Sequence, residues 1–155
     1  MAIRKIRTDD DEILRKVSKP VRNFDTALHE LLDDMAETMY DAEGVGLAAP
    51  QIGLLKRIFV IDIGEGITEF INPEIVETSG EQVGDEGCLS VPAKYGLVTR
   101  PHTVKIKALD RHGVSFEISG EEFMARAMCH EFDHLEGKLF VDFIEGDLFD
   151  VPPEE

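Results

Sequence analysis

Apolar positions at helical spacing predict one helix near the start of the chain, over residues 25–43. The apolar positions that recur about one turn apart are Leu28, Leu31, Leu32, Met35 and Met39. This spacing is typical of an amphipathic helix that buries one face against a core. Asn23 or Asp25 can cap its start, and Gly44 can end it. We expect the apolar face of this helix to be core rather than a functional surface.

Alternating and continuous apolar runs in the middle of the chain predict strands. The expected strands cover residues 57–63, 67–71, 74–78, 102–109 and 114–118. Residues 44–51 and 84–92 are bounded by glycines and are expected to be loops. The strands come between two helices, and their short connections favour antiparallel pairing. The sequence therefore predicts an α+β fold, in which antiparallel sheets pack around a helix near the C-terminus.

That second helix is predicted over residues 120–136. Ser119-Gly120-Glu121-Glu122 has the form of a capping box, which marks a helix start. Gly137 follows as a C-terminal stop. The apolar residues of this stretch spread around most of the helix circumference, which is typical of a buried helix.

The chain has 155 residues, of which 43% are hydrophobic and 31% are charged, and its formal net charge is −16. These values indicate one globular domain over residues 1–155, with an irregular arm over 1–24 and an acidic tail over 146–155. So negative a charge argues against nonspecific binding to nucleic acid or to an anionic membrane. No apolar run is long enough to span a bilayer, and the N-terminus lacks the apolar core of a signal peptide. We therefore expect a cytoplasmic protein.

The candidate chemistry lies in the second predicted helix, where His130-Glu131-Phe132-Asp133-His134 has the form H-E-x-x-H. Residues four apart lie on one face of a helix, so both imidazoles can bind one metal ion while Glu131 reaches a water on that ion. The alternative for this short motif is a pair of core histidines with Glu131 at the surface. Buried histidines need partners, which a shared metal would supply.

A catalytic metal site commonly has three protein ligands and one open position. Cys88 is the best candidate for the third ligand, because its glycine-flanked loop can approach closely and a thiolate binds borderline-soft cations well. Cys129 precedes His130, so its side chain points about 100° around the helix from that histidine. We expect Cys129 to be a small buried residue rather than a ligand. Two histidines and one cysteine in a tetrahedron suit zinc.

Three separate blocks of the sequence resemble the peptide deformylase family. They are residues 44–51 (GVGLAAPQ), 86–90 (EGCLS) and 130–137 (HEFDHLEG). Each block is modest by itself, but all three in the family's order and at its usual spacing are highly specific. The resemblance extends from about residue 2 to residue 145. It implies a metal-dependent hydrolase of a bacterial-type cytoplasm, which removes the formyl group from the N-terminal formylmethionine of newly synthesised polypeptides.

The resemblance also implies a role for each site residue. The residues that would bind the metal, with water in the fourth place, are Cys88, His130 and His134. Gln51 by its side chain and Leu89 by its backbone N–H would steady the oxyanion, and Glu131 would be the general acid and base. The residues that would bind substrate are Gly46 and Gly87 by their backbone, and Val45, Phe123 and Ala127 around the methionine side chain.

The implied cofactor is one Fe²⁺ per chain, with zinc, nickel or cobalt able to occupy the site. The implied partners are formyl-Met nascent polypeptides at the ribosome, bound by a monomer that has no nucleic-acid site of its own and no membrane segment. Arg126 faces roughly the same way as the pocket residues, so it could pair with an acid such as Glu86 or narrow the pocket.

Two other functions remain open from the residues. The first is a different H-E-x-x-H metallohydrolase or peptidase, although such peptidases usually take histidine or glutamate as the third ligand. The second is a protein without activity that holds a structural zinc. A structural site is usually closed by four protein ligands, and Cys129 would be the only nearby fourth. A panel of peptides separates the first from a deformylase, because internal cleavage without release of formate indicates a peptidase.

Overall fold

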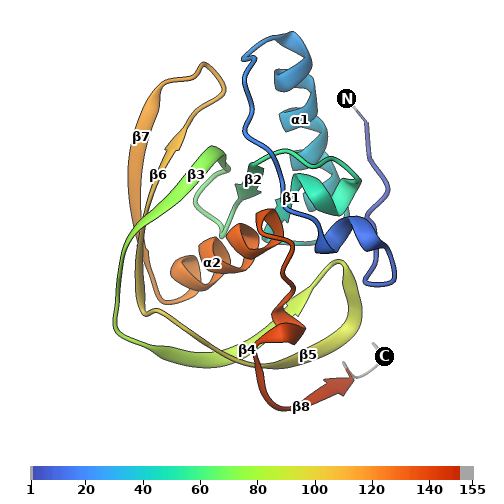
Figure 1. Ribbon diagram of the computed structural model, residues 1–155, viewed down its shortest axis with the longest axis vertical. Helices are drawn as coiled ribbons and strands as arrows, with labels where there is room; N and C mark the ends of the chain where they lie inside the picture. Colours follow the sequence, from blue (N-terminus) through green and yellow to red (C-terminus); the bar gives the residue numbers. More distant parts are fainter. Residues whose placement is uncertain (1, 151–155) are drawn as a thin grey trace.

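The computed structural model describes residues 2–150. Within that range, two α-helices and eight strands form an α+β fold (Figure 1). The helices are α1 (Thr26–Asp41) and α2 (Phe123–Leu135), with 3₁₀ turns η1 (Glu12–Arg15), η2 (Ala49–Ile52) and η3 (Phe140–Asp142). The strands are β1 (Gly46–Ala48), β2 (Ile58–Ile61), β3 (Thr68–Ser79), β4 (Gln82–Cys88), β5 (Val91–Arg100), β6 (Thr103–Leu109), β7 (Ser115–Glu121) and β8 (Ile144–Asp150).

Over the described residues the strands make two antiparallel sheets. The larger has the order β1-β2-β3-β6-β7, and the smaller has the order β4-β5-β8. In Figure 1, α2 lies inside the curve that β3, β6 and β7 make, and β4 and β5 cross below it. The predicted fold class is therefore confirmed, with antiparallel sheets around a helix near the C-terminus.

The main core lies between α2 and the larger sheet. Its buried residues include Ala48, Phe59, Phe70, Ile106, Met128 and Leu135. Phe59 and Phe70 stack with their ring centroids 4.6 Å apart. Full burial of each large apolar side chain contributes about 1.5–3 kcal/mol, so the packing of α2 residues such as Met128 and Leu135 in this core fixes the position of the helix against the sheet. The same packing fixes the two histidines that α2 carries.

The helix predicted over residues 25–43 is confirmed as α1. The Asp25 side chain accepts a hydrogen bond from the backbone N–H of Leu28 at 3.1 Å, which caps the helix start. All five apolar residues predicted for its buried face are buried, and they form a second cluster with β1 and β2. After α1 the chain turns through Glu43, at a φ of 58°, and enters β1 at Gly46.

The predicted start of the second helix is wrong. Ser119 does not cap a helix, because Ser119, Gly120 and Glu121 continue β7 and pair with β6. The helix begins at Phe123, after Glu122 turns the chain with a φ of 54°. A Cβ at Gly120 would lie 2.6 Å from Cγ of Met124, so this glycine lets α2 pack closely onto the end of the strand. Strand pairing and close packing thus override the local capping pattern.

Other boundaries also differ from the prediction, and the expected loop over 44–51 contains β1 and most of η2. Residues 67–71 and 74–78 form one strand, β3, with a register shift between Ile71 and Glu74 rather than a break. The expected loop over 84–92 is mostly strand, because β4 runs to Cys88 and pairs with β5 across a tight turn. Of the expected acidic tail, residues 146–150 belong to β8, which pairs with β5, and residues 151–155 lie outside the described residues.

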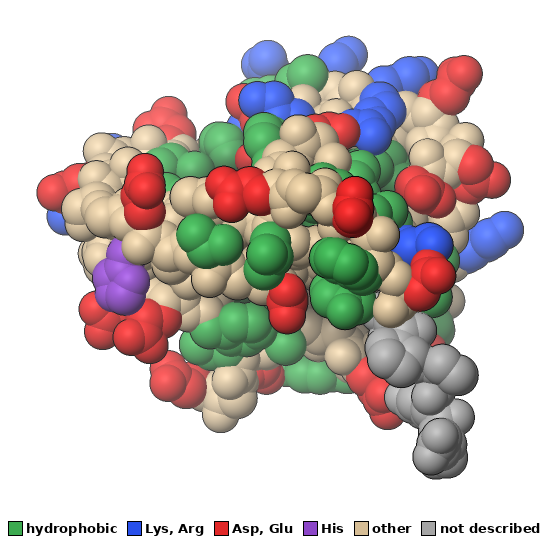
Figure 2. Space-filling view, turned by 90° about the horizontal axis from the view of Figure 1, so that it is seen from below, with side chains coloured by type: hydrophobic (Ala, Val, Ile, Leu, Met, Phe, Trp, Pro, Cys, Tyr) green, Lys and Arg blue, Asp and Glu red, His purple; other side chains and the backbone are tan. Residues whose placement is uncertain are grey.

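The surface charge is unevenly distributed. On the face that Figure 2 shows, acidic side chains lie among apolar ones, whereas Lys and Arg gather along the rim. Nucleic-acid binding requires clustered cations to neutralise phosphates, so this face does not fit such a partner. No helix of residues 2–150 is both long and apolar enough to cross a membrane.

Candidate active site

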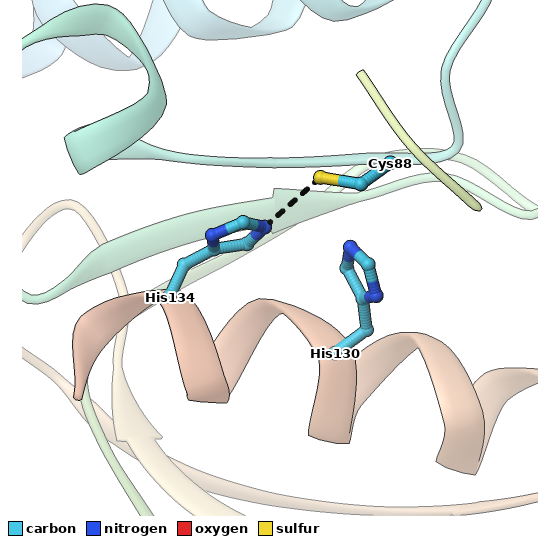
Figure 3. Close-up of side chains that lie close together, drawn as sticks. All are labelled: Cys88, His130 and His134. Carbon is cyan, nitrogen blue, oxygen red and sulfur yellow. Dashed lines mark hydrogen bonds between the residues drawn. The ribbon is translucent and has the colours of Figure 1, made fainter. Parts of the chain in front are cut away.

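Three potential metal ligands converge between α2 and the end of β4. His130 and His134 are four residues apart on α2, and Cys88 is the last residue of β4. Figure 3 shows both rings pointing from the helix toward the sulfur. Sγ of Cys88 lies 3.3 Å from Nε2 of His134, and one ligand atom from each of the three residues lies within 4.8 Å of the others. The structure thus brings together the three residues that the sequence singles out.

The donor set fits a divalent cation. An ion bonded at about 2.0–2.3 Å to tetrahedral sulfur and nitrogen ligands holds those ligand atoms roughly 3.3–3.6 Å apart. The separation of 3.3 Å between Cys88 and His134 agrees with such a site. Cys129 is buried in the main core with 6% of its surface exposed, as the sequence predicts, and does not belong to the group. Three converging ligands leave a position open, which is typical of catalytic rather than structural zinc-type sites.

Glu86 orients the first histidine from behind. Nδ1 of His130 lies 2.8 Å from Oε1 of Glu86, so Nε2 is the nitrogen left to bind a metal. Arg100 contacts both carboxylate oxygens of Glu86, each at 2.8 Å, and Arg126 donates to Oε2 at 2.6 Å. Arg100 also donates to Asp133 at 2.6 Å. A buried carboxylate with this many charged donors is stabilised in its ionised form and held in one position.

The two histidines titrate in opposite directions. Burial lowers the pKa of His130, but the nearby Cys88 and the hydrogen-bonded Glu86 outweigh it and hold that pKa well above its usual range. Burial and the neighbouring His130 lower the pKa of His134 well below its usual range. Burial raises the pKa of Glu86, yet Arg100 and His130 together hold it far below the ordinary value. An imidazole must be neutral to bind a metal ion, so His134 is already in that form, whereas His130 would release its proton on binding one.

Glu131 points toward β1 with one oxygen unpaired. A Cβ at Gly46 would lie 2.5 Å from Oε2 of Glu131, so the carboxylate is pressed against the glycine backbone. Oε1 is buried and has no hydrogen-bond partner among the described residues. Burial raises the pKa of Glu131 to about 7. A pKa near neutrality suits a group that both accepts and releases a proton.

Gln51 comes from η2 and reaches the same site. Its Oε1 accepts a hydrogen bond from the backbone N–H of Ala48 at 2.9 Å, which fixes the direction of the amide. Its Nε2 then donates to Oγ of Ser90 at 3.1 Å and lies 3.5 Å from Sγ of Cys88. The amide N–H₂ group is thus presented beside the third ligand, where a donor can meet a substrate oxygen.

A cleft of about 580 Å³ opens over these groups. Most of the site residues predicted from the sequence line this cleft. They are Val45, Gly46, Gln51, Gly87, Cys88, Leu89, Phe123, Ala127, His130 and Glu131. His134 lies deeper, with 1% of its surface exposed, and touches the site through Cys88. The predicted residues are therefore brought to one place, and the pairing suggested between Arg126 and Glu86 is present.

Arg100 is not among the site residues predicted from the sequence, and Asp133 has no predicted role. Arg100 is buried, and it joins Glu86 on β4 to Asp133 on α2. Asp133 lies inside the H-E-x-x-H motif, so its position next to the predicted ligands could have been recognised from the sequence. Arg100 carries no local signal, because only the pairing of β4 with β5 brings it near Glu86.

Comparisons with known proteins agree with this geometry. The family model described as polypeptide deformylase matches residues 3–147. A peptide deformylase of Alkaliphilus metalliredigens is 59% identical over 144 residues, covering 93% of this chain and 98% of its own. The crystal structure of a peptide deformylase from Legionella pneumophila has a TM-score of 0.90 and 54% identity, over 93% of this chain and 87% of the other.

Another similar structure contains a bound ligand. It is a peptide deformylase from Synechococcus elongatus in complex with actinonin, with a TM-score of 0.89 and 39% identity, over 91% of this chain and 78% of the other. These matches do not favour the alternative of a different H-E-x-x-H peptidase.

Proposed function

Because this chain belongs to the peptide deformylase family, whose reaction removes the formyl group from N-terminal formylmethionine, we propose that the cleft between α2 and β4 carries out that hydrolysis. The observation that supports this assignment most is the convergence of Cys88, His130 and His134 beside a buried carboxylate with a free oxygen. A divalent cation held by these three residues would supply Lewis acidity, which polarises a carbonyl and lowers the pKa of water to about 7 in favourable sites.

Glu131 is proposed as the group that moves protons. Its pKa of about 7 lets it accept the proton of the attacking water near neutral pH. Once protonated, it delivers that proton to the departing amine nitrogen, which is a poor leaving group as an anion. The contact with Gly46 holds the carboxylate in place, and the free Oε1 is the atom available for the transfer.

Gln51 and Leu89 are proposed to stabilise negative charge on the formyl oxygen. The amide of Gln51 is oriented in advance by Ala48, so it needs no rearrangement when charge develops. Leu89 follows the ligand Cys88 directly and also lines the cleft, so its backbone N–H is close to the reacting centre. Donors of this kind are worth about 3–4 kcal/mol each in other enzymes.

The substrate is proposed to lie between the two glycine-bearing strands. Gly46 on β1 and Gly87 on β4 both line the cleft, and their backbones can pair with an extended peptide. Val45, Phe123 and Ala127 supply apolar surface for the first side chain. Phe123 is 52% exposed and Val45 is 41% exposed, so binding a methionine side chain would cover apolar groups that otherwise face water.

The remaining assignments are proposals of the same kind. We infer Fe²⁺ as the native metal, one per chain, with zinc, nickel or cobalt able to replace it. We also infer that the protein is a monomer that meets formyl-Met polypeptides as they leave the ribosome in the cytoplasm. Elemental analysis of protein purified without oxygen, with light scattering of the same sample, tests the metal and the oligomeric state.

The assay that tests the function is formate release from a formyl-Met tripeptide. We expect one formate per peptide and no cleavage of internal amides. Actinonin, which the Synechococcus structure contains, provides a second measurement, because calorimetry should detect its binding to the metal-loaded protein. Internal cleavage without formate would contradict the proposal.

A further inference from the structure

Ser90 is a fully buried serine that contacts two residues of the cleft. None of its surface is exposed, and it lies outside the set of described residues that line the cleft. Its Oγ accepts a hydrogen bond from Nε2 of Gln51 at 3.1 Å, and its backbone N–H donates to Sγ of Cys88 at 3.4 Å. One residue therefore contacts both the proposed third metal ligand and the proposed oxyanion donor.

The side-chain amide of Gln51 is held at both of its polar atoms. The backbone N–H of Ala48 can only donate, so its partner at 2.9 Å must be the oxygen, and the nitrogen must face Ser90. An amide nitrogen carries two hydrogens, and Oγ of Ser90 accepts one of them. The other is left on the side of Cys88, whose Sγ lies 3.5 Å from Nε2. The second N–H is therefore presented beside the metal ligands.

We propose that Ser90 is a positioning residue, whose hydroxyl fixes the plane of the Gln51 amide so that the second N–H of Nε2 meets the formyl oxygen as negative charge develops there. This inference rests on the proposed function, which gives Gln51 that role. Without the hydroxyl, only the hydrogen bond from Ala48 remains, and the amide can rotate about it. A donor stabilises developing charge best when it is already in place, so Ser90 acts on kcat rather than on substrate binding.

Ser90→Ala removes the hydroxyl but keeps the backbone N–H that donates to Cys88. For a formyl-Met tripeptide, kcat per bound metal should fall about 10- to 100-fold, because a misplacement of about 1 Å can cost about 10²-fold, while KM should stay within about twofold. Ser18→Ala is the matched control. Ser18 is also buried, with 4% of its surface exposed, but its Oγ has no hydrogen-bond partner among residues 2–150. The control should keep the kcat of wild type.

A double-mutant cycle measures whether Ser90 acts through Gln51. Gln51→Ala alone should lower kcat about 10²- to 10³-fold, the usual loss for one oxyanion donor. Adding Ser90→Ala to it should change kcat by less than about twofold, because the amide that Ser90 orients is already gone. A merely structural role would instead lower kcat equally in both backgrounds.

A second measurement needs neither metal nor turnover. The side-chain N–H₂ signals of Gln51 in the ¹⁵N–¹H spectrum of metal-free protein can be assigned by their absence from Gln51→Ala. They should shift in Ser90→Ala, which removes their acceptor, and stay in place in Ser18→Ala. Ser90→Cys carries both tests if Ser90→Ala does not fold, because a thiol has nearly the same shape and is a weaker acceptor.

The possible failures are distinguishable. Wild-type kcat in Ser90→Ala, an equal fall in kcat with and without Gln51, or unmoved Gln51 signals would each overturn the role of Ser90 and leave the proposed function standing. Absence of formate release by metal-loaded wild-type protein would instead refute the proposed function, and with it the part that Ser90 has in that reaction.

Discussion

The buried carboxylates and histidines around α2 form two regions that differ in how their charges are satisfied. In the paired region, Glu86 is bound by Arg100, Arg126 and His130. The unpaired region consists of Glu131 and His134, which are buried to the same degree. There, Oε1 of Glu131 and Nδ1 of His134 have no partner within residues 2–150.

The two regions therefore have different roles: the paired region positions side chains, and the unpaired region is available for the reaction. Burying an ionisable group without a partner is unfavourable, so a fold keeps such groups where a ligand or a reaction uses them. The paired region holds the ring of His130 in one orientation, whereas the unpaired region keeps a carboxylate of raised pKa next to the cleft. Stability should therefore depend on the first region and turnover on the second.

Removing the carboxylate of the unpaired region gives the largest expected effect. Glu131→Gln should lower kcat by about 10²- to 10⁴-fold, the usual contribution of general acid–base catalysis. Metal content and the free energy of unfolding should stay close to wild type, because no hydrogen bond to Oε1 is lost. Formate release, elemental analysis and urea denaturation measure the three quantities.

Glu121→Gln, an exposed change on β7, is the control for this variant. Turnover of Glu131→Gln at the level of that control would remove Glu131 from the chemistry and erase the distinction between the two regions.

The reverse behaviour is expected when the paired region is broken. Glu86→Gln leaves the buried cation of Arg126 without its counter-charge and leaves Arg100 with Asp133 alone, and breaking a buried ion pair costs about 3–5 kcal/mol. Metal affinity should also fall about 10- to 100-fold, because the carboxylate that orients His130 is lost. Urea denaturation of the metal-free protein and metal titration measure these effects.

Glu117→Gln is the matched control, since Glu117 pairs with Lys105 at 3.7 Å on the exposed face of the sheet. An exposed pair contributes about 0–1 kcal/mol. If both variants lose equal stability, the paired region has no special structural role.

The smallest of the three effects concerns the two thiols. Cys88→Ala should bind less than about a tenth of the metal of wild type, whereas Cys129→Ala should bind a full equivalent, because a catalytic site needs its third ligand. In metal-free protein, iodoacetamide should modify Cys88 first, since burial raises the pKa of Cys129 to about 11. Mass spectrometry of the two sites, with and without added metal, checks this. Equal metal content in both alanine variants would exclude Cys88 as a ligand.

Much of this site could be predicted from the sequence because its signals are local. The spacing of His130 and His134 fixes their common helix face wherever the helix lies. The glycines around Cys88 indicate a close approach of the backbone. The apolar stripe of α1 likewise gives the helix, its cap at Asp25 and its buried face.

The features that the sequence does not give depend on strand pairing. Arg100 lies opposite Gln82 in the ladder of β4 and β5, so its contact with Glu86 follows from register and not from any spacing along the chain. The predicted start of α2 differs from the observed start at Phe123 for the same reason, which is strand pairing. The pairing of β7 with β6 extends through Glu121, and a capping pattern cannot compete with a complete ladder.

The close approach of β1 to Glu131 restricts how this enzyme can change over evolutionary time. Residue 46 has no room for even a methyl group, since that atom would overlap the carboxylate that we propose as the proton carrier. Any heritable substitution there displaces Glu131, so a lineage cannot alter this position and keep full activity. An antibacterial compound that contacts the backbone at residue 46 would therefore meet a point where resistance by substitution carries its own loss of fitness.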